Sequence, residues 1–509
     1  MSELMWRPSE QRIKQTNMYD FMQYVNDKYG REFEEYHQLW EWSINNIPSL
    51  WESLWDYMDI IHSAPYREVI VGEDRMPGAE WFPGARLNFA ENLLRYRDGR
   101  PAIISRNEKG KTREITYRDL YGRVAGLARS MRDMGITRGD RVVGFMPNIP
   151  ETIIAMLASA SIGALWSSCS PDFGIQGVLD RFGQIEPRLI FTADGYTYKG
   201  RKFNSLEEIS SILKKLPSIE KVVVVPFTEE NPDISGIGNG VMWGDFISDS
   251  TEIDFEQLPF QHPLYIMYSS GTTGLPKCMV QSAGGILIHH MKELALHTDL
   301  KREDRIFYFT TCGWMMWNWL TSSLALGATV ILFDGAPFYP QPGTLFRMAE
   351  ELKITIFGTS AKYLSALNGS GVRPGKEFDL SPLKAILSTG SPLHNTEFDY
   401  VYQDIKKDLC LSSISGGTDL NGCFAAGNPM GPVYRGELQC RTLGMNVRAF
   451  DKNGNSVENQ QGELVCLSPF PSMPIYFWND EDGNKYHHAY FDVYPGVWRH
   501  GDYIKITEH

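Results

Sequence analysis

The segment from Tyr265 to Lys277 reads Tyr-Ile-Met-Tyr-Ser-Ser-Gly-Thr-Thr-Gly-Leu-Pro-Lys, an apolar run that changes to hydroxyl residues and glycines and ends in a lysine. Glycines let backbone N–H groups approach an anion closely, Ser and Thr add hydroxyl donors, and lysine adds a mobile positive charge. These residue types predict a loop that grips phosphate groups. A glycine-rich hairpin between two strands, at 264–268 and 278–281, fits the same sequence equally well.

The spacing of this loop excludes the most common type of nucleotide-binding loop. A Walker A loop requires Gly-x-x-x-x-Gly-Lys-Ser/Thr. Here Gly271 and Gly274 are three residues apart, Lys277 follows a proline, and Cys278 stands where a magnesium-binding hydroxyl should be. A phosphate-binding loop of this kind would therefore belong to a different class of nucleotide enzyme.

Ser-Ser-Gly-Thr-Thr-Gly-x-Pro-Lys resembles the signature loop of the acyl-adenylate-forming enzymes, the superfamily that includes the acyl-CoA synthetases. Other blocks that resemble this family follow in the expected order: Thr-Tyr-Arg-Asp-Leu at 116–120, Gly-Asp-Arg-Val-Val at 139–143, Ser-Thr-Gly-Ser-Pro at 388–392, Ser-Gly-Gly-Thr-Asp at 415–419, Gly-Glu-Leu-Val at 462–465 and Trp-Arg-His-Gly-Asp at 498–502. The resemblance thus covers nearly the whole chain, and it implies an enzyme that uses ATP to activate a carboxylic acid.

The resemblance implies a catalytic role for Lys277, Thr418 and Asp419. Acyl adenylate formation brings two anions together, the acid and the α-phosphate of ATP, so neutralising charge is the main task. Thr418 would contact the α-phosphate, and Asp419 would bind Mg²⁺ through hard carboxylate oxygens where the family has a glutamate, which is one methylene longer. The β and γ phosphates would be held by Ser269, Ser270, Gly271, Thr272, Thr273, Gly274 and Lys277.

The same resemblance implies sites for the rest of ATP and for coenzyme A. Gly390, Ser391 and Pro392 resemble a Gly-Glu-Pro turn that passes beside the adenine, with serine in place of the acidic residue. Asp502 matches an aspartate that accepts hydrogen bonds from both ribose hydroxyls, and the neighbouring His500 is expected to be structural. Arg201, in Gly-Arg-Lys at 200–202, resembles a stretch that meets the phosphates of CoA, although a basic trio in a solvated surface loop is the usual alternative.

The block at 81–94 resembles that of the short-chain branch of the family rather than that of the long-chain enzymes, so the acid is expected to be short. Where acetyl-CoA synthetases carry a tryptophan that closes the pocket, this chain has Gly416, and a longer acid should fit. The combination with Trp-Met-Met-Trp-Asn-Trp at 314–319 resembles the acetoacetate-activating members, and propionate, butyrate and 3-hydroxybutyrate are the alternatives. Residues expected in the pocket are Trp314, Met315, Asn318, Ser415, Gly416 and Gly417, of which Asn318 or Ser415 could meet the ketone oxygen.

Short apolar segments that alternate with helical periodicity are the elements that must position these residues. Strands are predicted at 141–146, 222–225, 264–268, 328–333, 354–357, 385–387 and 411–414. Helices are predicted at 120–134, 151–165, 285–297 and 343–352. This βα alternation predicts an α/β fold with mainly parallel sheets, and the family implies two such sheets in layers with helices, plus a small antiparallel β-subdomain.

Three regions are expected along the chain. Residues 1–98 would form an N-terminal extension, whose aromatic-rich part at 19–58 reads as helices packed on the outside of the first subdomain. Residues 99–439 would form the AMP-binding core. Residues 440–509 would form the β-subdomain, because segments 446–450 and 463–467 read as antiparallel strands and Asn453-Gly454 is a hairpin turn signal.

Composition limits the other possibilities. A chain of 509 residues is expected to form two or more subdomains. The 49 Lys and Arg against 62 Asp and Glu give a net charge of -13, which argues against a general nucleic-acid binder. Seven cysteines without a Cys-x-x-Cys pair, and no signal-type apolar stretch at the start, are typical of a cytoplasmic protein.

The uncharged run at 306–333 is long enough to span a bilayer. Polar residues interrupt it, however, and its second half has the β-branched look of a buried strand, so a loop and helix followed by a strand are predicted and membrane insertion is not.

The end of the chain differs from the family pattern. The family continues after the aspartate that matches Asp502 with a small mobile domain that carries the adenylating lysine, and neither follows here. The sequence thus predicts the large N-terminal domain alone, which can bind ATP and the acid but lacks the adenylating lysine and half of the CoA tunnel. Such a chain is expected to bind nucleotide with little turnover. A protein that binds acyl adenylates or CoA without catalysis is the alternative from another functional class.

Overall fold

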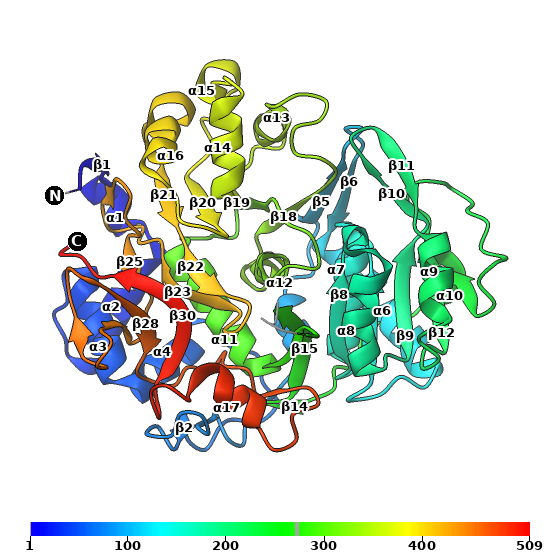
Figure 1. Cartoon of the computed structure of the whole chain (residues 1–509), viewed down its shortest axis with the longest axis horizontal. Coiled ribbons are helices and arrows are strands. Elements are labelled where there is room, and N and C mark those ends of the chain that lie inside the picture. Colours follow the sequence, from blue (N-terminus) through cyan, green and yellow to red (C-terminus); the bar gives the residue numbers. More distant parts are fainter. Residues whose placement is uncertain (1, 270–273) are drawn as a thin grey trace.

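The first of two large sheets has eight strands and is mainly parallel (Figure 1). The computed structural model describes residues 2–269 and 274–509. In spatial order the strands are β13 (Gly240–Met242), β12 (Lys221–Val225), β9 (Leu189–Ala193), β7 (Arg141–Phe145), β8 (Leu165–Cys169), β15 (Pro263–Ser269), β16 (Lys277–Ser282) and β29 (Tyr476–Phe477). Neighbours from β13 to β15 run parallel, whereas β16 pairs antiparallel with both β15 and β29.

The second large sheet has seven strands, and six of them run parallel. Their order is β21 (Cys410–Ser413), β20 (Ala385–Thr389), β19 (Ile356–Ser360), β17 (Arg305–Tyr308), β18 (Thr329–Asp334), β5 (Pro101–Asn107) and β6 (Thr112–Thr116), with β6 antiparallel to β5. Each of the seven strands predicted from the sequence coincides with a strand of one of these two sheets. The predicted α/β fold class is confirmed.

Helices cover both faces of each sheet, as buried parallel strands require. The four predicted helices correspond to α6, α7, α11 with the π-helical turn Glu293–His297, and α13. The helices are α1 (Glu10–Lys14), α2 (Asn17–Tyr29), α3 (Tyr36–Asn45), α4 (Ile47–Tyr57), α5 (Phe89–Leu93), α6 (Tyr117–Asp133), α7 (Pro150–Ser161), α8 (Gly174–Ile185), α9 (Leu206–Leu213), α10 (Trp243–Phe246), α11 (Ala283–Lys292), α12 (Met315–Thr321), α13 (Thr344–Glu351), α14 (Ala361–Gly369), α15 (Pro374–Glu377), α16 (Asn395–Tyr400) and α17 (Asn484–Tyr490).

The apolar clusters show how these layers are stacked. Val142 of β7 and Ile306 of β17 belong to one central cluster with α6, α7 and α11, so these helices lie between the two sheets. The adjacent Val143 points to the opposite face of β7, where it packs with Val178 of α8. The outer face of the second sheet packs against α13, α14 and α16. The result is a layered α/β/α/β/α arrangement with α11 at its centre.

Small antiparallel sheets complete the fold. After residue 440 a four-stranded sheet has the order β27 (Ser456–Val457), β26 (Val447–Phe450), β28 (Gln461–Cys466) and β30 (Trp498–Lys505). The predicted turn joins β26 to β27, and Gly454 takes its left-handed position with φ +80°. A three-stranded sheet is formed by β22 (Ser415–Gly417), β23 (Gly422–Ala426) and β25 (Cys440–Arg441). Two-stranded pairs are β1 (Leu4–Trp6) with β24 (Val433–Tyr434), β10 (Gly195–Tyr198) with β11 (Arg201–Asn204), β14 (Leu258–Pro259) with β4 (Arg86–Leu87), and β2 (Ile70–Val71) with β3 (Glu80–Trp81).

The aromatic-rich segment 19–58 is helical as predicted, but its place in the fold differs from the prediction. Helices α2 to α4 pack against α11 and against the segment that follows β25 rather than only on the outside of the first subdomain. Trp51 is fully buried with its ring centre 6.0 Å from that of His289, and Ser43 Oγ accepts from the backbone N–H of Gly444 at 3.0 Å. Burying the large aromatic side chains of these helices is favourable, and this explains why they pack as part of the core.

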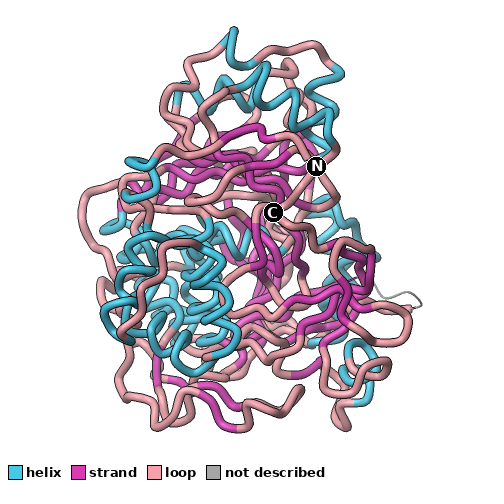
Figure 2. Tube along the Cα trace, turned by 90° about the vertical axis from the view of Figure 1, so that its left-hand side faces the viewer, coloured by secondary structure: helices cyan, strands magenta, loops and turns pink. Residues whose placement is uncertain are grey.

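The two ends of the chain lie close together (Figure 2). Strand β1 pairs with β24, and the His509 ring stacks on Tyr434 of β24 with ring centres 3.8 Å apart.

The uncharged run at 306–333 divides into β17, α12 and β18, as predicted. Across the described residues, no helix combines the length and apolar character needed to cross a membrane.

Candidate active site

The residues predicted to bind adenine and the acid lie where two strands of the second sheet end. Gly390 follows β20, and Ser415 begins β22 just after β21. The side chain of Thr389 donates to the carbonyl of Ile414 at 3.1 Å, which keeps the two strand ends together. Gly390, Ser391 and Pro392 are exposed, whereas Ser415, Gly416 and Gly417 are half-buried. Ligand crevices in α/β sheets form at such carboxyl ends.

Lys277 lies at the edge of the first sheet, where β15 and β16 form a hairpin. Ser269 and Lys277 face each other across the hairpin, and Gly274 in the connection has φ +109°. The hairpin interpretation of this segment was therefore right about the backbone, and a hairpin loop is compatible with phosphate binding. Four residues of the predicted phosphate loop, Ser270, Gly271, Thr272 and Thr273, lie outside the described residues.

Lys277 and Asp419 meet at the ring of Tyr490, on α17. The Tyr490 hydroxyl donates a hydrogen bond to Oδ1 of Asp419, and the Lys277 Nζ atom lies 5.5 Å from the centre of the Tyr490 ring. Trp498 stacks on the other side with ring centres 3.8 Å apart and an interplanar angle of 14°. Burial, and secondly the charge of Asp419, raise the pKa of Tyr490 well above its usual range, so this hydroxyl keeps its proton and acts as a donor.

Asp419 keeps one oxygen available for a ligand. Among the described residues, Oδ2 accepts no hydrogen bond, whereas Oδ1 is held by Tyr490. The Asp419 side chain is thus oriented by the hydrogen bond to Tyr490 at Oδ1, while the half-buried residue keeps Oδ2 without a hydrogen bond to the described residues. Tyr490 is not predictable from the sequence, because α17 reads Asn-Lys-Tyr-His-His-Ala-Tyr and nothing in it distinguishes one tyrosine from the other.

His500 and Asp502 lie on β30 beside the turn that carries Asp419. The His500 ring packs edge-on against Phe424 at 4.9 Å, and its Nε2 atom lies 3.6 Å from Oδ2 of Asp502, whose side chain is 64% exposed. A Cβ atom at Gly417 would approach Cε1 of His500 to 3.0 Å, so a glycine suits this close approach. The buried ring fits the structural role expected of His500.

The acyl-pocket residues are placed in three different environments. A Cβ atom at Gly416 would lie 2.0 Å from the carbonyl oxygen of Gly422, so the close approach of β22 and β23 by itself requires a glycine here. Trp314 is 59% exposed and its ring lies 6.4 Å from that of Phe173. Asn318 is buried, and neither the nitrogen nor the oxygen of its side-chain amide has a hydrogen-bond partner among the described residues. Met315, at the start of α12, is half-buried.

Arg201 is exposed and is not brought together with the other predicted site residues. It begins β11 of the β10–β11 hairpin, which lies at the opposite side of the molecule from β30 in Figure 1. The buried side chain of Glu108 accepts hydrogen bonds from the backbone N–H groups of Lys199 and Gly200 in the hairpin turn and from that of Ala336 at 2.8 Å. Glu108 therefore ties this hairpin to the loop after β18.

Comparisons with known proteins place the chain in a family. The family model described as "AMP-binding enzyme" matches residues 89–477, and the model described as "Acetyl-coenzyme A synthetase N-terminus" matches residues 36–93. The chain therefore belongs to the family of AMP-binding enzymes.

Individual relatives are similar over almost the whole chain. The acetoacetyl-CoA synthetase of Gallus gallus is 48% identical, in an alignment that covers 99% of this chain and 77% of that protein. The acetoacetyl-coenzyme A synthetase of Rhizobium meliloti (strain 1021) is 46% identical, with 99% and 78% covered. The structure of acetoacetyl-CoA synthetase from Streptomyces lividans superposes with a TM-score of 0.95 at 42% identity, covering 99% of this chain and 79% of that one.

These comparisons do not support the prediction that the chain is only an N-terminal domain with impaired turnover. The similarity to the synthetases extends through β30 and the residues around Asp502. Family membership, rather than the position of the last residue, therefore guides the functional interpretation.

Proposed function

We propose that this protein uses ATP to activate acetoacetate to an acyl adenylate and then transfers the acyl group to coenzyme A. The observation that carries the proposal is the similarity to proteins named acetoacetyl-CoA synthetase, which reaches 46–48% identity over 99% of this chain in chicken, zebrafish and mouse. In the first step a carboxylate oxygen bonds to the α-phosphorus and pyrophosphate leaves. In the second step the CoA thiol bonds to the acyl carbon and AMP leaves.

The cluster around Tyr490 supports the first step. Lys277 supplies a positive charge where the hairpin loop joins β16, opposite Ser269. The loop from Ser269 to Gly274 would bind the β and γ phosphates together with Lys277. Thr418 stands directly before Asp419 in the turn after β22, where its hydroxyl would contact the α-phosphate. Charge that develops on the phosphates would thus be met from two sides, which is the largest single source of catalysis in such reactions.

Mg²⁺ fits this site as an ion held largely by the nucleotide. Across the described residues, no group of three or more His, Cys, Asp or Glu side chains could hold a metal ion. Asp419 offers one carboxylate oxygen, because Tyr490 occupies the other. Mg²⁺ commonly binds through one or two carboxylates plus phosphates and water, and the ion would neutralise phosphate charge there.

Two kinds of relative point to an acid with a carbonyl group at C3. One group is the acetoacetyl-CoA synthetases, and another relative is the malonamoyl-CoA synthetase of Penicillium aethiopicum, which is 41% identical over 99% of this chain. Both acyl groups named carry a second carbonyl two bonds beyond the carboxyl carbon, as a ketone or as an amide. Malonamate is therefore the second candidate substrate, and Asn318 or Ser415 would meet this carbonyl.

The remaining assignments follow the family pattern. The turn Gly390–Ser391–Pro392 would lie beside adenine, Asp502 would bind the ribose, and Arg201 would meet phosphates of coenzyme A. We also propose functional divisions after residues 98 and 439, which separate the N-terminal extension, the AMP-binding core and the β-rich region that carries Asp502.

A panel of acids tests the proposal. AMP release would be measured with MgATP, CoA and acetoacetate, malonamate, propionate, butyrate or 3-hydroxybutyrate, and Asp419→Ala would serve as the inactive control. We expect the highest kcat/KM with acetoacetate. A higher value with propionate or butyrate would overturn the choice of acid, and AMP release with none of them, alongside measurable nucleotide binding, would favour a non-catalytic binding protein.

A further inference from the structure

Helix α11 is fully buried and yet strongly polar along one side. Every residue from Gln281 through the π-helical turn at Glu293–His297 is buried. Buried helices are normally apolar all round, but α11 carries His289 and His290, Gln281 stands just before it, and Glu293 begins the π-helical turn that continues it. Charged residues at such positions are rare unless they are paired, so each of these side chains requires a partner.

The first partner is the backbone of the turn that carries Asp419. The Gln281 side-chain amide, just before α11, donates to the carbonyl oxygens of Asp419 at 2.9 Å and of Thr418 at 3.3 Å. This side chain is fully buried, so the two hydrogen bonds form away from water. Gln281 therefore stabilises the proposed catalytic turn through two hydrogen bonds to its main chain.

The second partner is Asn421, which lies further along the same turn. His290 Nε2 lies 2.7 Å from the carbonyl oxygen of Asn421, and because a carbonyl can only accept, Nε2 carries the proton. Nδ1 lies 2.8 Å from Oγ of Ser322, which follows α12, so in the neutral ring the serine hydroxyl donates to Nδ1. Burial lowers the pKa of His290, in agreement with the neutral ring. His290 thus joins the turn to the helix that carries the acyl-pocket residues.

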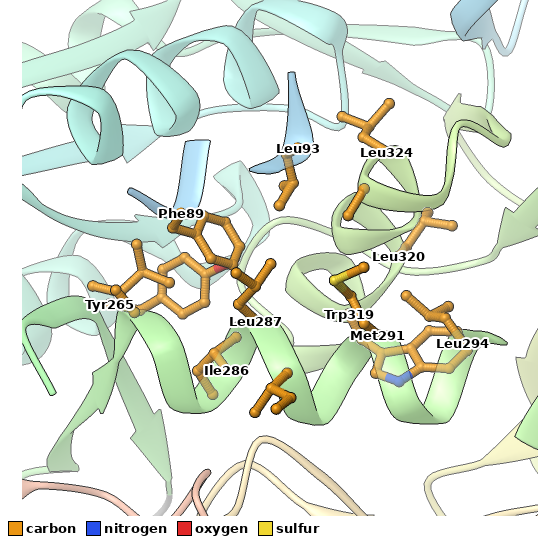
Figure 3. Packing of buried hydrophobic residues seen from close by; sticks show 14 of the residues in the cluster. Phe89, Leu93, Tyr265, Ile286, Leu287, Met291, Leu294, Trp319, Leu320 and Leu324 are labelled. Carbon is orange, nitrogen blue, oxygen red and sulfur yellow. The ribbon is translucent and has the colours of Figure 1, made fainter. Parts of the chain in front are cut away.

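The third contact makes the same connection through one carboxylate. Glu293 Oε1 accepts from the backbone N–H of Cys423 in β23 at 2.7 Å, and Oε2 accepts from Nε1 of Trp319 in α12 at 2.8 Å. Figure 3 shows the Trp319 indole lying beside Met291 and Leu294 of this helix. Oε1 also lies 2.9 Å from Nε2 of His289, one turn earlier in α11. Although burial raises the pKa of Glu293, His289 and then Lys292 lower it more, to about 2, so the carboxylate is ionised at neutral pH and both of its oxygens accept.

We infer that Glu293 is a positioning residue that fixes the nucleotide side of the site relative to the acid side. One of its oxygens holds the strand that follows the Thr418–Asp419 turn, and the other holds the helix that carries Met315 and Asn318. The inference rests on the proposed function, because it concerns the distance between the acid carboxylate and the α-phosphate. A displacement of about 1 Å in such a pair costs on the order of 100-fold in rate.

The variant Glu293→Gln tests the inference with almost no change in shape. The amide can accept at only one oxygen, so its NH₂ group must face an N–H donor, either that of Cys423 or that of Trp319. We expect kcat for AMP formation to fall about tenfold or more while KM for ATP and for acetoacetate changes less than about twofold. Trp319→Phe removes one of the two N–H donors that face residue 293. The double variant with Glu293→Gln should therefore regain about a third or more of the kcat lost in Glu293→Gln. The single variant Trp319→Phe measures the effect of the smaller ring.

Hydrogen exchange at the Cys423 amide separates this inference from the proposed function. We expect faster exchange at residues 418–423 in Glu293→Gln than in the unmodified protein, with or without MgATP. If the unmodified protein forms no AMP with any acid, the proposed function fails, and the exchange data still show whether Glu293 holds the turn at residues 418–423. Unchanged amide exchange at residues 418–423 in Glu293→Gln would overturn the inference. A kcat of Glu293→Gln within twofold of the unmodified value would do the same. So would a double variant whose loss in kcat equals the product of the losses in the two single variants.

Discussion

The turn at residues 415–423 and the β10–β11 hairpin both present residues predicted to contact substrates, but they are built differently. Buried side chains from β16, from α11 and from the π-helical turn after α11 hold the backbone of the turn at Asp419, Asn421 and Cys423. In the hairpin, all four residues of β11 are exposed, and one buried carboxylate, that of Glu108, holds its turn.

This difference matches what each region would have to do. A carboxylate that acts on a reacting phosphate must be placed within a fraction of an ångström, and buried side chains that hydrogen-bond to its backbone can provide such precision. A guanidinium group that neutralises the charge of a flexible co-substrate needs no such frame, since attraction between exposed charges is weakly directional and screened by salt. Substitutions in the turn should therefore change rate constants, and substitutions in the hairpin should change apparent affinity.

The largest effect is expected from Asp419→Ala. If Asp419 binds Mg²⁺ as proposed, removing the carboxylate takes away the protein ligand of the ion, and we expect kcat/KM for AMP formation to fall about 1000-fold. Asp419→Asn keeps an acceptor for Tyr490 but not the charge, and it should lose about 100-fold. Steady-state AMP release over a range of MgCl₂ concentrations would measure both. Equal activity in Asp419→Asn and the unmodified protein would show that the charge plays no part.

Lys277→Ala should have the next largest effect. Lys277 is only partly buried, so the lost charge is partly replaced by water, and we expect kcat/KM for ATP to fall about 30-fold. Lys277→Arg keeps a positive charge over the Tyr490 ring and should retain more than half of the activity. If the alanine and arginine variants behave alike, the lysine acts through its shape or not at all.

The sequence predicted the scaffold of this site better than its internal contacts. Buried parallel strands are continuous apolar runs, so a segment such as Val222 to Val225 is visible without any knowledge of its neighbours. Tyr490 could not be found in this way, because its partner Asp419 lies in a distant part of the chain. The sequence identifies Gly416 as a pocket residue that replaces a tryptophan. Its close approach to Gly422, however, depends on a strand pairing that one sequence does not reveal. Likewise, the helical period at 285–297 gave no sign of the π-helical turn at Glu293–His297.

Tyr490→Phe tests how far the orientation of Asp419 depends on this missed contact. Phenylalanine keeps the stack on Trp498 but removes the hydrogen bond to Oδ1, and we expect kcat to fall about tenfold, as for a lost hydrogen bond to a charged group. Tyr486→Phe is a matched control, because the Tyr486 ring packs in the same cluster and its hydroxyl forms no hydrogen bond with the described residues. A similar loss in both variants would assign the effect to packing instead of orientation.

The acid stability of the protein should reflect the frame beneath the turn. The pKa of Glu293 is lowered to about 2 from an ordinary value of 4.5, so its contribution to stability is present above about pH 4.5 and is lost as the pH falls toward 2. Glu293→Gln cannot titrate and should therefore have a lower Tm than the unmodified protein at pH 6. The Tm difference should narrow at pH 4 and below. A difference that stays constant over this range would argue against an ionised Glu293.

The smallest effect is expected at the exposed hairpin, from Arg201→Ala. An exposed charge pair contributes less than about 1 kcal/mol, so KM for CoA should rise about threefold. The adenylation step does not use CoA, and pyrophosphate release in the absence of CoA should be unchanged. Lys202→Ala is the matched control at the neighbouring position. Because Lys202 already forms an ion pair with Glu229, we expect this variant to leave KM for CoA unaltered. A loss of adenylation in Arg201→Ala would mean that the hairpin, like the turn, is part of the frame of the reacting groups, and the contrast between the two regions would then fail.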